Sequence, residues 1–187
     1  MKKDKFVKNR IVKMIAGVAG VSALLAVGIA QAGVTTVGKP GVVKLMKADT
    51  GKVSGKNEVT YSGATPHTVI EQVLPGFPFP SFEADKQTNP TLVYDAGVKK
   101  VTITVINTNG GAEHSFMITK KGPPFSAMPN PSSLHAMAEV PELPAASGGQ
   151  FNTDTVEWTP PGAGTYYYLC KTPGHASTGM FGKIIVK

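Results

Sequence analysis

The chain has 187 residues, with 19 Lys and Arg against 12 Asp and Glu, a formal net charge of +7 and one Cys. This length suits one domain with a hydrophobic core. With 41% hydrophobic and 17% charged residues, the composition excludes an acidic disordered chain and a long charged coiled coil. The single Cys excludes an internal disulfide and any metal site that needs several thiolates.

The excess positive charge is concentrated near the N-terminus. Residues 2–13 include six basic residues and one acidic residue, residues 14–30 include no charged residue, and Ala30-Gln31-Ala32 follows. This pattern predicts a secretory signal peptide over residues 1–32, cleaved after Ala32, and hence a periplasmic protein. The alternative is an uncleaved membrane anchor, for which 17 uncharged residues are short against the about 20 that span a bilayer.

Removal of the signal peptide leaves residues 33–187, which we expect to form one domain without a membrane span. Of the charged residues, 19 minus 6 leaves 13 basic and 12 minus 1 leaves 11 acidic, for a net charge of +2. This segment contains no Arg. Because nucleic-acid recognition depends on Arg side chains and clustered positive charge, no nucleic-acid partner is expected.

The remaining sequence predicts an all-β domain. A short helix is expected over residues 41–47, after Pro40. The segment 101–105 alternates Val and Ile with Thr, which predicts a strand with one buried face. Residues 122–150, rich in Pro, Ser and Ala, are expected to form a long surface loop. About eight strand candidates separated by Gly and Pro turns indicate a β-sandwich or barrel: residues 57–62, 68–74, 91–95, 101–105, 114–119, 155–158, 164–170 and 181–186.

The one Cys lies in a pattern that is typical of a metal site. Cys170 ends a predicted strand, His175 follows five residues later and Met180 five residues after that, with Gly and Pro between them. Such a loop can direct sulfur, imidazole and thioether toward one point. A second His is needed from elsewhere, and His114 begins another predicted strand. His67 and His135 are outside any ligand-spaced segment and are expected in solvated loops.

A thiolate, two imidazoles and a weak axial thioether form the trigonal site that suits copper in one-electron transfer. The alternative is a buried, inert Cys with unrelated His and Met nearby. Zinc would accept Cys and two His, but an axial Met does not favour zinc. Haem attachment requires C-x-x-C-H, which is absent. A Cys–His nucleophile would lack an orienting Asn or Asp after His175.

Several segments resemble the cupredoxins, the family of type 1 blue copper proteins. The most specific is the last, which covers a ligand loop and a final strand; the likeness extends from about Asp49 to the C-terminus. The similar segments read DTGKVSG (residues 49–55), LPGFPFPSFE (74–83), INTNGGAEHSF (106–116), ITKKGPPF (118–125) and GTYYYLCKTPGHASTGMFGKIIVK (164–187). The segment before Asp49 and the loop 128–155, which contains His135, depart from the family pattern.

The resemblance implies a cupredoxin-like Greek-key β-sandwich that binds one type 1 copper ion through His114, Cys170, His175 and Met180, with Ser115 after the first ligand. It also implies a monomeric electron carrier, not an enzyme, in a respiratory chain, that of iron oxidation. The expected partners are redox proteins, c-type cytochromes among them, docking near His175. The rival functions are a copper carrier or storage protein and a copper enzyme domain, which would need more His residues.

Burial of the copper site is expected to raise its reduction potential, because a low-dielectric shell disfavours the more highly charged Cu(II) state. The candidates for this shell are aromatic residues that the core could equally use: Phe77, Phe79, Phe82, Phe116, Phe125 and Phe181.

Overall fold

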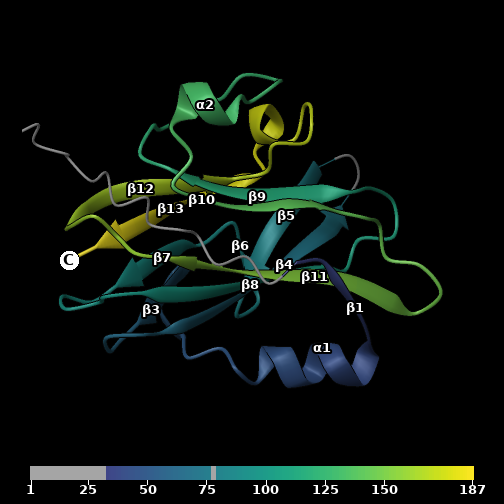
Figure 1. Ribbon diagram of the computed structural model, residues 1–187, viewed down its shortest axis with the longest axis horizontal. Coiled ribbons are helices and arrows are strands. Elements are labelled where there is room, and N and C mark those ends of the chain that lie inside the picture. Colours follow the sequence, from purple (N-terminus) through teal and green to yellow (C-terminus); the bar gives the residue numbers. More distant parts are fainter. Residues whose placement is uncertain (1–32, 77–78) are drawn as a thin grey trace, which may run out of the picture.

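Two packed β-sheets form the computed structural model, which describes residues 33–76 and 79–187 (Figure 1). The predicted signal peptide therefore lies outside the described residues. The strands are β1 (Thr35–Gly38), β2 (Lys52–Gly55), β3 (Glu58–Tyr61), β4 (His67–Gly76), β5 (Phe79–Ala84), β6 (Gln87–Thr88), β7 (Thr91–Tyr94), β8 (Val101–Asn107), β9 (His114–Thr119), β10 (Ala138–Leu143), β11 (Gln150–Trp158), β12 (Gly164–Leu169) and β13 (Phe181–Val186). The helical segments are α1 (Lys39–Met46), α2 (Pro131–Leu134) and η1 (Ala176–Thr178).

The strand order confirms the predicted all-β sandwich. One sheet has the order β1-β11-β8-β4-β5-β6 and the other β10-β9-β12-β13-β7-β3-β2. Strands far apart in sequence are neighbours, as in the parallel pairs of β4 with β8 and β13 with β7, which fits Greek-key connections. Among the described residues, no strand pairing joins the two sheets into a closed barrel. Each of the eight predicted segments overlaps a strand.

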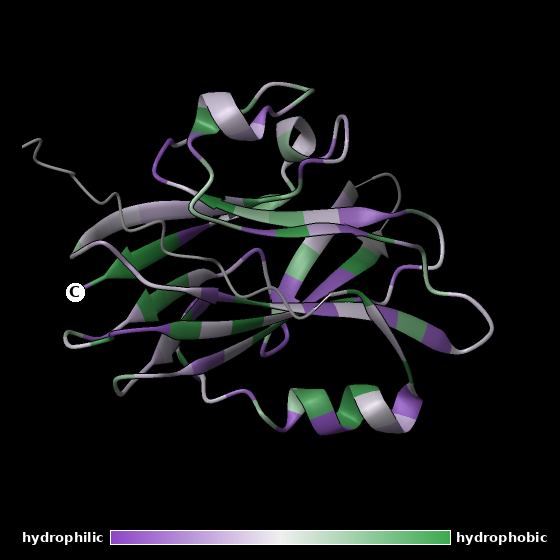
Figure 2. Cartoon of the chain, in the orientation of Figure 1, coloured by the Kyte–Doolittle hydropathy of each residue, from purple (hydrophilic) through white to green (hydrophobic). Residues whose placement is uncertain are grey.

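The core lies between the sheets and is rich in aromatic residues. Val101, Ile103 and Val105 of β8 have no exposed surface, as their alternation predicts. Trp158 packs edge to face on Tyr94 and Tyr166. Alternating apolar and polar residues are visible along the strands in Figure 2. Such burial is the main favourable contribution to folding, at about 25 cal/mol per Å² of apolar surface.

The buried face predicted for the segment 101–105 is confirmed, and Thr104 on the opposite face is buried as well, with 2% of its surface exposed. Its hydroxyl lies 2.9 Å from His67 Nε2 and 2.9 Å from Thr155 Oγ1. His67 therefore belongs to β4 and not to a solvated loop. Hydrogen bonds to neighbouring strands make the burial of this Thr tolerable.

The prediction of a surface loop over residues 122–150 is also wrong in part, because this segment contains α2 and β10. β10 pairs with β9, and Ala138, Val140 and Leu143 are fully buried. The register shifts between Val140 and Leu143, so the strand lacks the even alternation by which strands are recognised.

The helix predicted over residues 41–47 is confirmed as α1. It begins two residues earlier, at Lys39, with Pro40 in its first turn, where the fixed φ of proline is favourable. None of its residues is fully buried. In the described part of the chain, no helix has the length and apolar character needed to cross a membrane.

Candidate metal centre

Two adjacent strands bring the first pair of predicted ligands together. β9 begins at His114, and β12 ends at Leu169, immediately before Cys170. The strands are antiparallel, with Leu169 opposite Met117. The start of one strand therefore lies beside the end of the other. This pairing places His114 near Cys170 although 56 positions separate them.

The loop from β12 to β13 returns to Cys170 through main-chain hydrogen bonds. Cys170 N donates to Met180 O at 3.1 Å, and Met180 N donates to His175 O at 2.9 Å. Gly174 and Gly179 have φ values of +87° and +113°, which glycine adopts without steric cost. The loop thus places His175 beside Cys170, and Met180 is fully buried in the same apolar cluster as Cys170.

The donor atoms of His114, Cys170 and His175 converge within 4.8 Å of one another. The two Nδ1 atoms are 3.1 Å apart, and Cys170 Sγ lies 3.9 Å from His114 Nδ1 and 3.5 Å from His175 Nδ1. Bonds of about 2.0–2.3 Å to a central ion at trigonal angles would separate such atoms by about 3.5–3.8 Å. The residues therefore fit a metal ion, and one thiolate with two imidazoles suits copper.

The two His side chains differ in burial. His114 has no exposed surface, whereas His175 is half-buried. Burial, together with the nearby His175, lowers the pKa of His114 from 6.5 to about 4. Burial also lowers the pKa of His175, while Glu113 and Glu142 act in the opposite direction. For both rings the lowered pKa favours the neutral form, which is the form that binds a metal.

Ser115 contacts the Cys170 sulfur from β9. Its main-chain N donates to Cys170 Sγ at 3.4 Å, and its Oγ lies 3.8 Å from the same sulfur. Lys171 N donates to Ser115 Oγ at 2.8 Å, and Lys171 Nζ forms an ion pair with Glu139 of β10. Hydrogen bonds around a ligating sulfur tune its electron donation.

Asn109 fixes the ring of His114. Its Nδ2 lies 2.8 Å from His114 Nε2, and its Oδ1 accepts from Gly111 N at 2.7 Å. With Nε2 held by Asn109, Nδ1 of His114 faces Cys170. Sequence reasoning missed this residue; its only signal is the turn-forming run Asn109-Gly110-Gly111 before the strand.

The predicted aromatic shell divides between two clusters. Phe82 and Phe116 pack edge to face in the core between the sheets. Phe125 and Phe181 pack together on the side of the ligand loop, in a cluster that includes Ala176. Phe77 lies outside the described residues, and the side chain of Phe79 is not described. The first cluster also contains Cys170 and Met180, and the second contains Ala176, the neighbour of His175.

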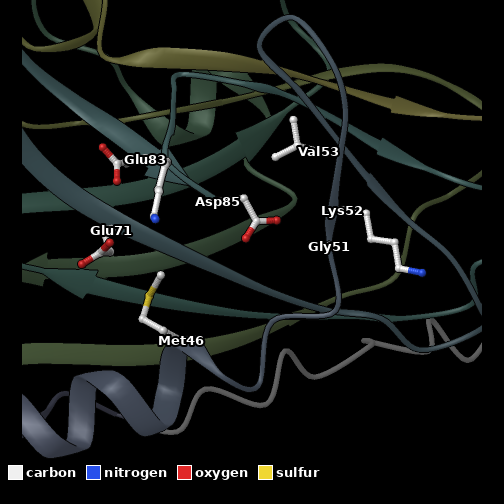
Figure 3. A pocket seen from close by; sticks show the side chains of 8 residues that line it. Met46, Gly51, Lys52, Val53, Glu71, Glu83 and Asp85 are labelled. Atoms are coloured by element: carbon white, nitrogen blue, oxygen red, sulfur yellow. The ribbon is translucent and has the colours of Figure 1, made fainter.

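Neither the remaining His residues nor the pocket in Figure 3 contributes to the converging donor atoms. His67 contacts Thr104, and His135 is exposed at the end of α2. The pocket of about 380 Å³ includes none of the predicted ligands. It is lined by Met46, Gly51, Lys52, Val53, Glu71, Glu83, Asp85 and Lys86.

Comparison with known proteins agrees with this geometry. Residues 87–187 match the family described as copper binding proteins of the plastocyanin/azurin family. Rusticyanin of Acidithiobacillus ferrooxidans is 55% identical over 148 residues, which cover 79% of this chain and 92% of that protein. A second rusticyanin of the same species is 49% identical over 178 residues, 92% of each chain.

The solved structure of rusticyanin from Thiobacillus ferrooxidans superposes with a TM-score of 0.74 at 49% identity, covering 83% of this chain and 97% of that one. Both the sequence and the fold are therefore shared along most of the chain. The chain belongs to the plastocyanin/azurin family of copper-binding proteins and is a blue copper electron-transfer protein similar to the rusticyanins.

Proposed function

We propose that the chain is a periplasmic electron carrier in which His114, Cys170, His175 and Met180 bind one type 1 copper ion. The observation that carries the proposal is the convergence of two imidazole nitrogens and one sulfur in a buried site. Bound copper supplies a one-electron Cu(II)/Cu(I) couple. Electron transfer without bond rearrangement in a substrate is the activity that such a site supports.

Each ligand has a distinct task in this proposal. Cys170 provides a soft thiolate, and fully buried Met180 provides a weak thioether, which together favour Cu(I). The neutral imidazoles of His114 and His175 also accommodate Cu(II). Because the site is buried, it disfavours the state with the greater net charge and so raises the reduction potential.

We place the route of the electron at His175. Among the four proposed ligands it is the one that is not fully buried, and Ala176, Phe125 and Phe181 next to it form an apolar cluster. In Figure 1, η1 lies beside α2 above β9. The ligand loop is also bonded to the segment before α2, because Gly174 N donates to Ala127 O at 2.6 Å. A c-type cytochrome docking on this face would approach the centre closely.

A respiratory chain of iron oxidation is the proposed setting. Its support is the likeness to rusticyanins, including those of Acidithiobacillus ferrooxidans. The setting also requires export, for which the predicted signal peptide over residues 1–32 would serve, leaving a monomeric domain of residues 33–187. Mass spectrometry of the exported protein should give an N-terminus at Gly33, and an N-terminus at Met1 would contradict the cleavage.

A copper carrier or storage protein is the alternative. Carriers exchange metal at accessible sites, whereas His114, Cys170 and Met180 here have no exposed surface. The same burial resists exchange and maintains the donor set in both oxidation states. It therefore favours electron transfer.

The deciding experiment is spectroscopy and voltammetry of the purified copper-loaded protein. We expect an intense visible thiolate-to-copper charge-transfer band and a reversible one-electron wave. Cys170→Ser, which keeps the volume and removes the thiolate, should abolish the band while far-UV circular dichroism stays unchanged. Binding of copper without band or wave, with rapid loss to a chelator, would support the carrier function instead.

The proposed setting is tested by anaerobic stopped-flow mixing of the oxidised protein with a reduced c-type cytochrome and, separately, with Fe²⁺. Bleaching of the band by the cytochrome supports the partner class. Failure of both reductants would remove the iron-oxidation chain from the proposal while leaving the electron carrier intact.

A further inference from the structure

A glutamine lies in the apolar core close to the metal centre. Gln72 of β4 has no exposed surface. The inward-facing positions of this strand are Thr68, Ile70 and Gln72, all of them buried. At such a position an apolar side chain would avoid the cost of removing an amide from water. The amide therefore requires an explanation other than packing.

Gln72 holds both ends of the connection between β8 and β9. Its main-chain O accepts from Thr108 N and from Thr108 Oγ1, both at 3.1 Å. Its side-chain Nε2 donates to Ser115 O at 3.0 Å. Thr108 and Ser115 bracket the segment that carries Asn109 and His114. One residue of the first sheet thus fixes this segment against the second sheet.

The other end of the amide has no partner. Gln72 Oε1 is buried and forms no hydrogen bond with any described residue. The carbonyl of Ser115 requires a donor, so the nitrogen must face Ser115 and the oxygen must face the core. An orphaned buried acceptor is rare and destabilising. The single bond to Ser115 is consequently what the side chain contributes.

Ser115 transmits this contact to the sulfur. Its main-chain N donates to Cys170 Sγ, and its Oγ accepts from Lys171 N. A donor directed at a thiolate withdraws electron density from the sulfur, and such contacts set the potential of a copper–thiolate centre. The position of Ser115, and so the strength of that contact, depends on what holds its carbonyl.

We infer that Gln72 is a positioning residue of the copper centre, which holds Ser115 so that its N–H remains directed at Cys170 Sγ and thereby raises the reduction potential. This inference rests on the proposed ligand set. The one hydrogen bond described for its side chain goes to the main chain of Ser115 and not to a proposed ligand. It acts through Ser115 alone.

The test is Gln72→Met, which keeps length and removes the donor. We expect a lower midpoint potential and a charge-transfer band at longer wavelength. A sulfur with a weaker hydrogen bond donates more electron density to copper, so it favours Cu(II) and transfers charge to it at lower energy. In the copper-free protein we expect amide hydrogen exchange at Ser115 to become about ten-fold faster through local opening. Gln72→Glu is the conservative variant, because burial favours its neutral form and the O–H of that form can donate to Ser115 O. At acidic pH this variant should therefore have the midpoint potential, the band position and the Ser115 exchange rate of the parent protein.

Thr68→Val is the matched control. Thr68 is fully buried on the same strand, and its Oγ1 lies 2.8 Å from Tyr94 OH. This variant also removes a buried hydrogen bond from β4. A purely structural effect would therefore change the potential, the band and the exchange of Ser115 to the same extent in both variants. The control should leave the potential, the band and the exchange of Ser115 unchanged.

The outcomes separate the inference from the proposed function. An unchanged potential and band in Gln72→Met, with a normal band in the parent protein, would overturn the inference alone. Equal shifts in Thr68→Val and Gln72→Met would overturn it as well. A parent protein without a charge-transfer band would overturn the proposed function and the tuning role with it. If Gln72→Met fails to fold, Gln72→Glu decides: a potential that stays constant between acidic and neutral pH, while its carboxyl ionises, contradicts the inference.

Discussion

Lowering the pH tests whether burial protects the copper site from protons. Copper and a proton compete for the same imidazole nitrogen, so a histidine must be neutral to bind the ion. Burial and the nearby His175 lower the pKa of His114 from 6.5 to about 4. Proton competition at this ligand therefore begins at a more acidic pH than it would at an exposed histidine.

The size of the protection follows from the two pKa values. At pH 4, an imidazole with its ordinary pKa of 6.5 would be about 300 times more often protonated than neutral, which weakens copper binding by about the same factor. With the pKa of His114 at about 4, the weakening is about two-fold. At pH 4 the lowered pKa of His114 should therefore give a copper affinity roughly two orders of magnitude higher than a histidine with the ordinary pKa would give.

The fold must be followed in the same titration, because the lowered pKa has a cost in the copper-free protein. Between pH 6.5 and about 4 the unfolded chain binds a proton at His114 that the folded chain does not. The free energy of unfolding of the copper-free protein consequently falls as the pH falls through this window. Copper loss caused by unfolding would otherwise be mistaken for proton competition at the ligand.

The assay is the charge-transfer band of the copper-loaded protein between pH 7 and 2, with far-UV circular dichroism at each step. Copper affinity is measured in parallel with a chelator whose own protonation is corrected for. We expect the band to persist to below about pH 4, given the pKa of His114. Loss of the band near pH 6 with an unchanged dichroism spectrum would refute the reasoning.

Three further variants test other features. Met180→Leu should keep the visible band and raise the midpoint potential in voltammetry, because it removes a weak donor to Cu(II); a lower potential would contradict the axial role. His175→Ala should slow electron exchange with a reduced c-type cytochrome by about ten-fold or more, and added imidazole should restore it; an unchanged rate would contradict this route. Glu71 lies opposite Glu83 across β4 and β5, and burial, together with that carboxylate, raises its pKa. Since the folded form then binds the proton more tightly, ionisation costs stability as the pH rises. Glu71→Gln should increase the free energy of urea unfolding by about 0.5 kcal/mol at pH 7 and leave it unchanged at pH 3; an equal gain at both values would contradict the repulsion.

The ligand loop could be predicted from the sequence because its three proposed ligands are close together in the chain. Cys170, His175 and Met180 lie within one turn of chain whose Gly and Pro residues predict a return, and the structure confirms that return through the bonds among their main-chain atoms. His114 was found differently, by its place at the start of a strand. That β9 and β12 are neighbours is a fact of topology, which spacing alone does not contain.

The parts that the sequence did not predict depend on partners far along the chain. β10 is a strand because it pairs with β9, although Pro141 and a register shift interrupt its alternation of apolar and polar residues. Gln72 would be expected to face solvent, yet its hydrogen-bond partner Ser115 lies 43 positions away. A polar residue is tolerated in a core when it has a hydrogen-bond partner. A partner this far along the chain can be identified only in the folded structure.

The arrangement also explains how one site can serve two oxidation states. His114 and Cys170 are fixed at adjacent ends of a hydrogen-bonded ladder, and His175 is tied to Met180 by the main chain of the ligand loop. Asn109 holds the ring of His114 through the nitrogen that faces away from the site. Because these constraints come from the protein and not from the ion, the donor atoms have little freedom to follow the different preferences of Cu(I) and Cu(II). A donor set that moves little between oxidation states makes electron transfer require little rearrangement, and the sandwich supplies that rigidity through main-chain bonds.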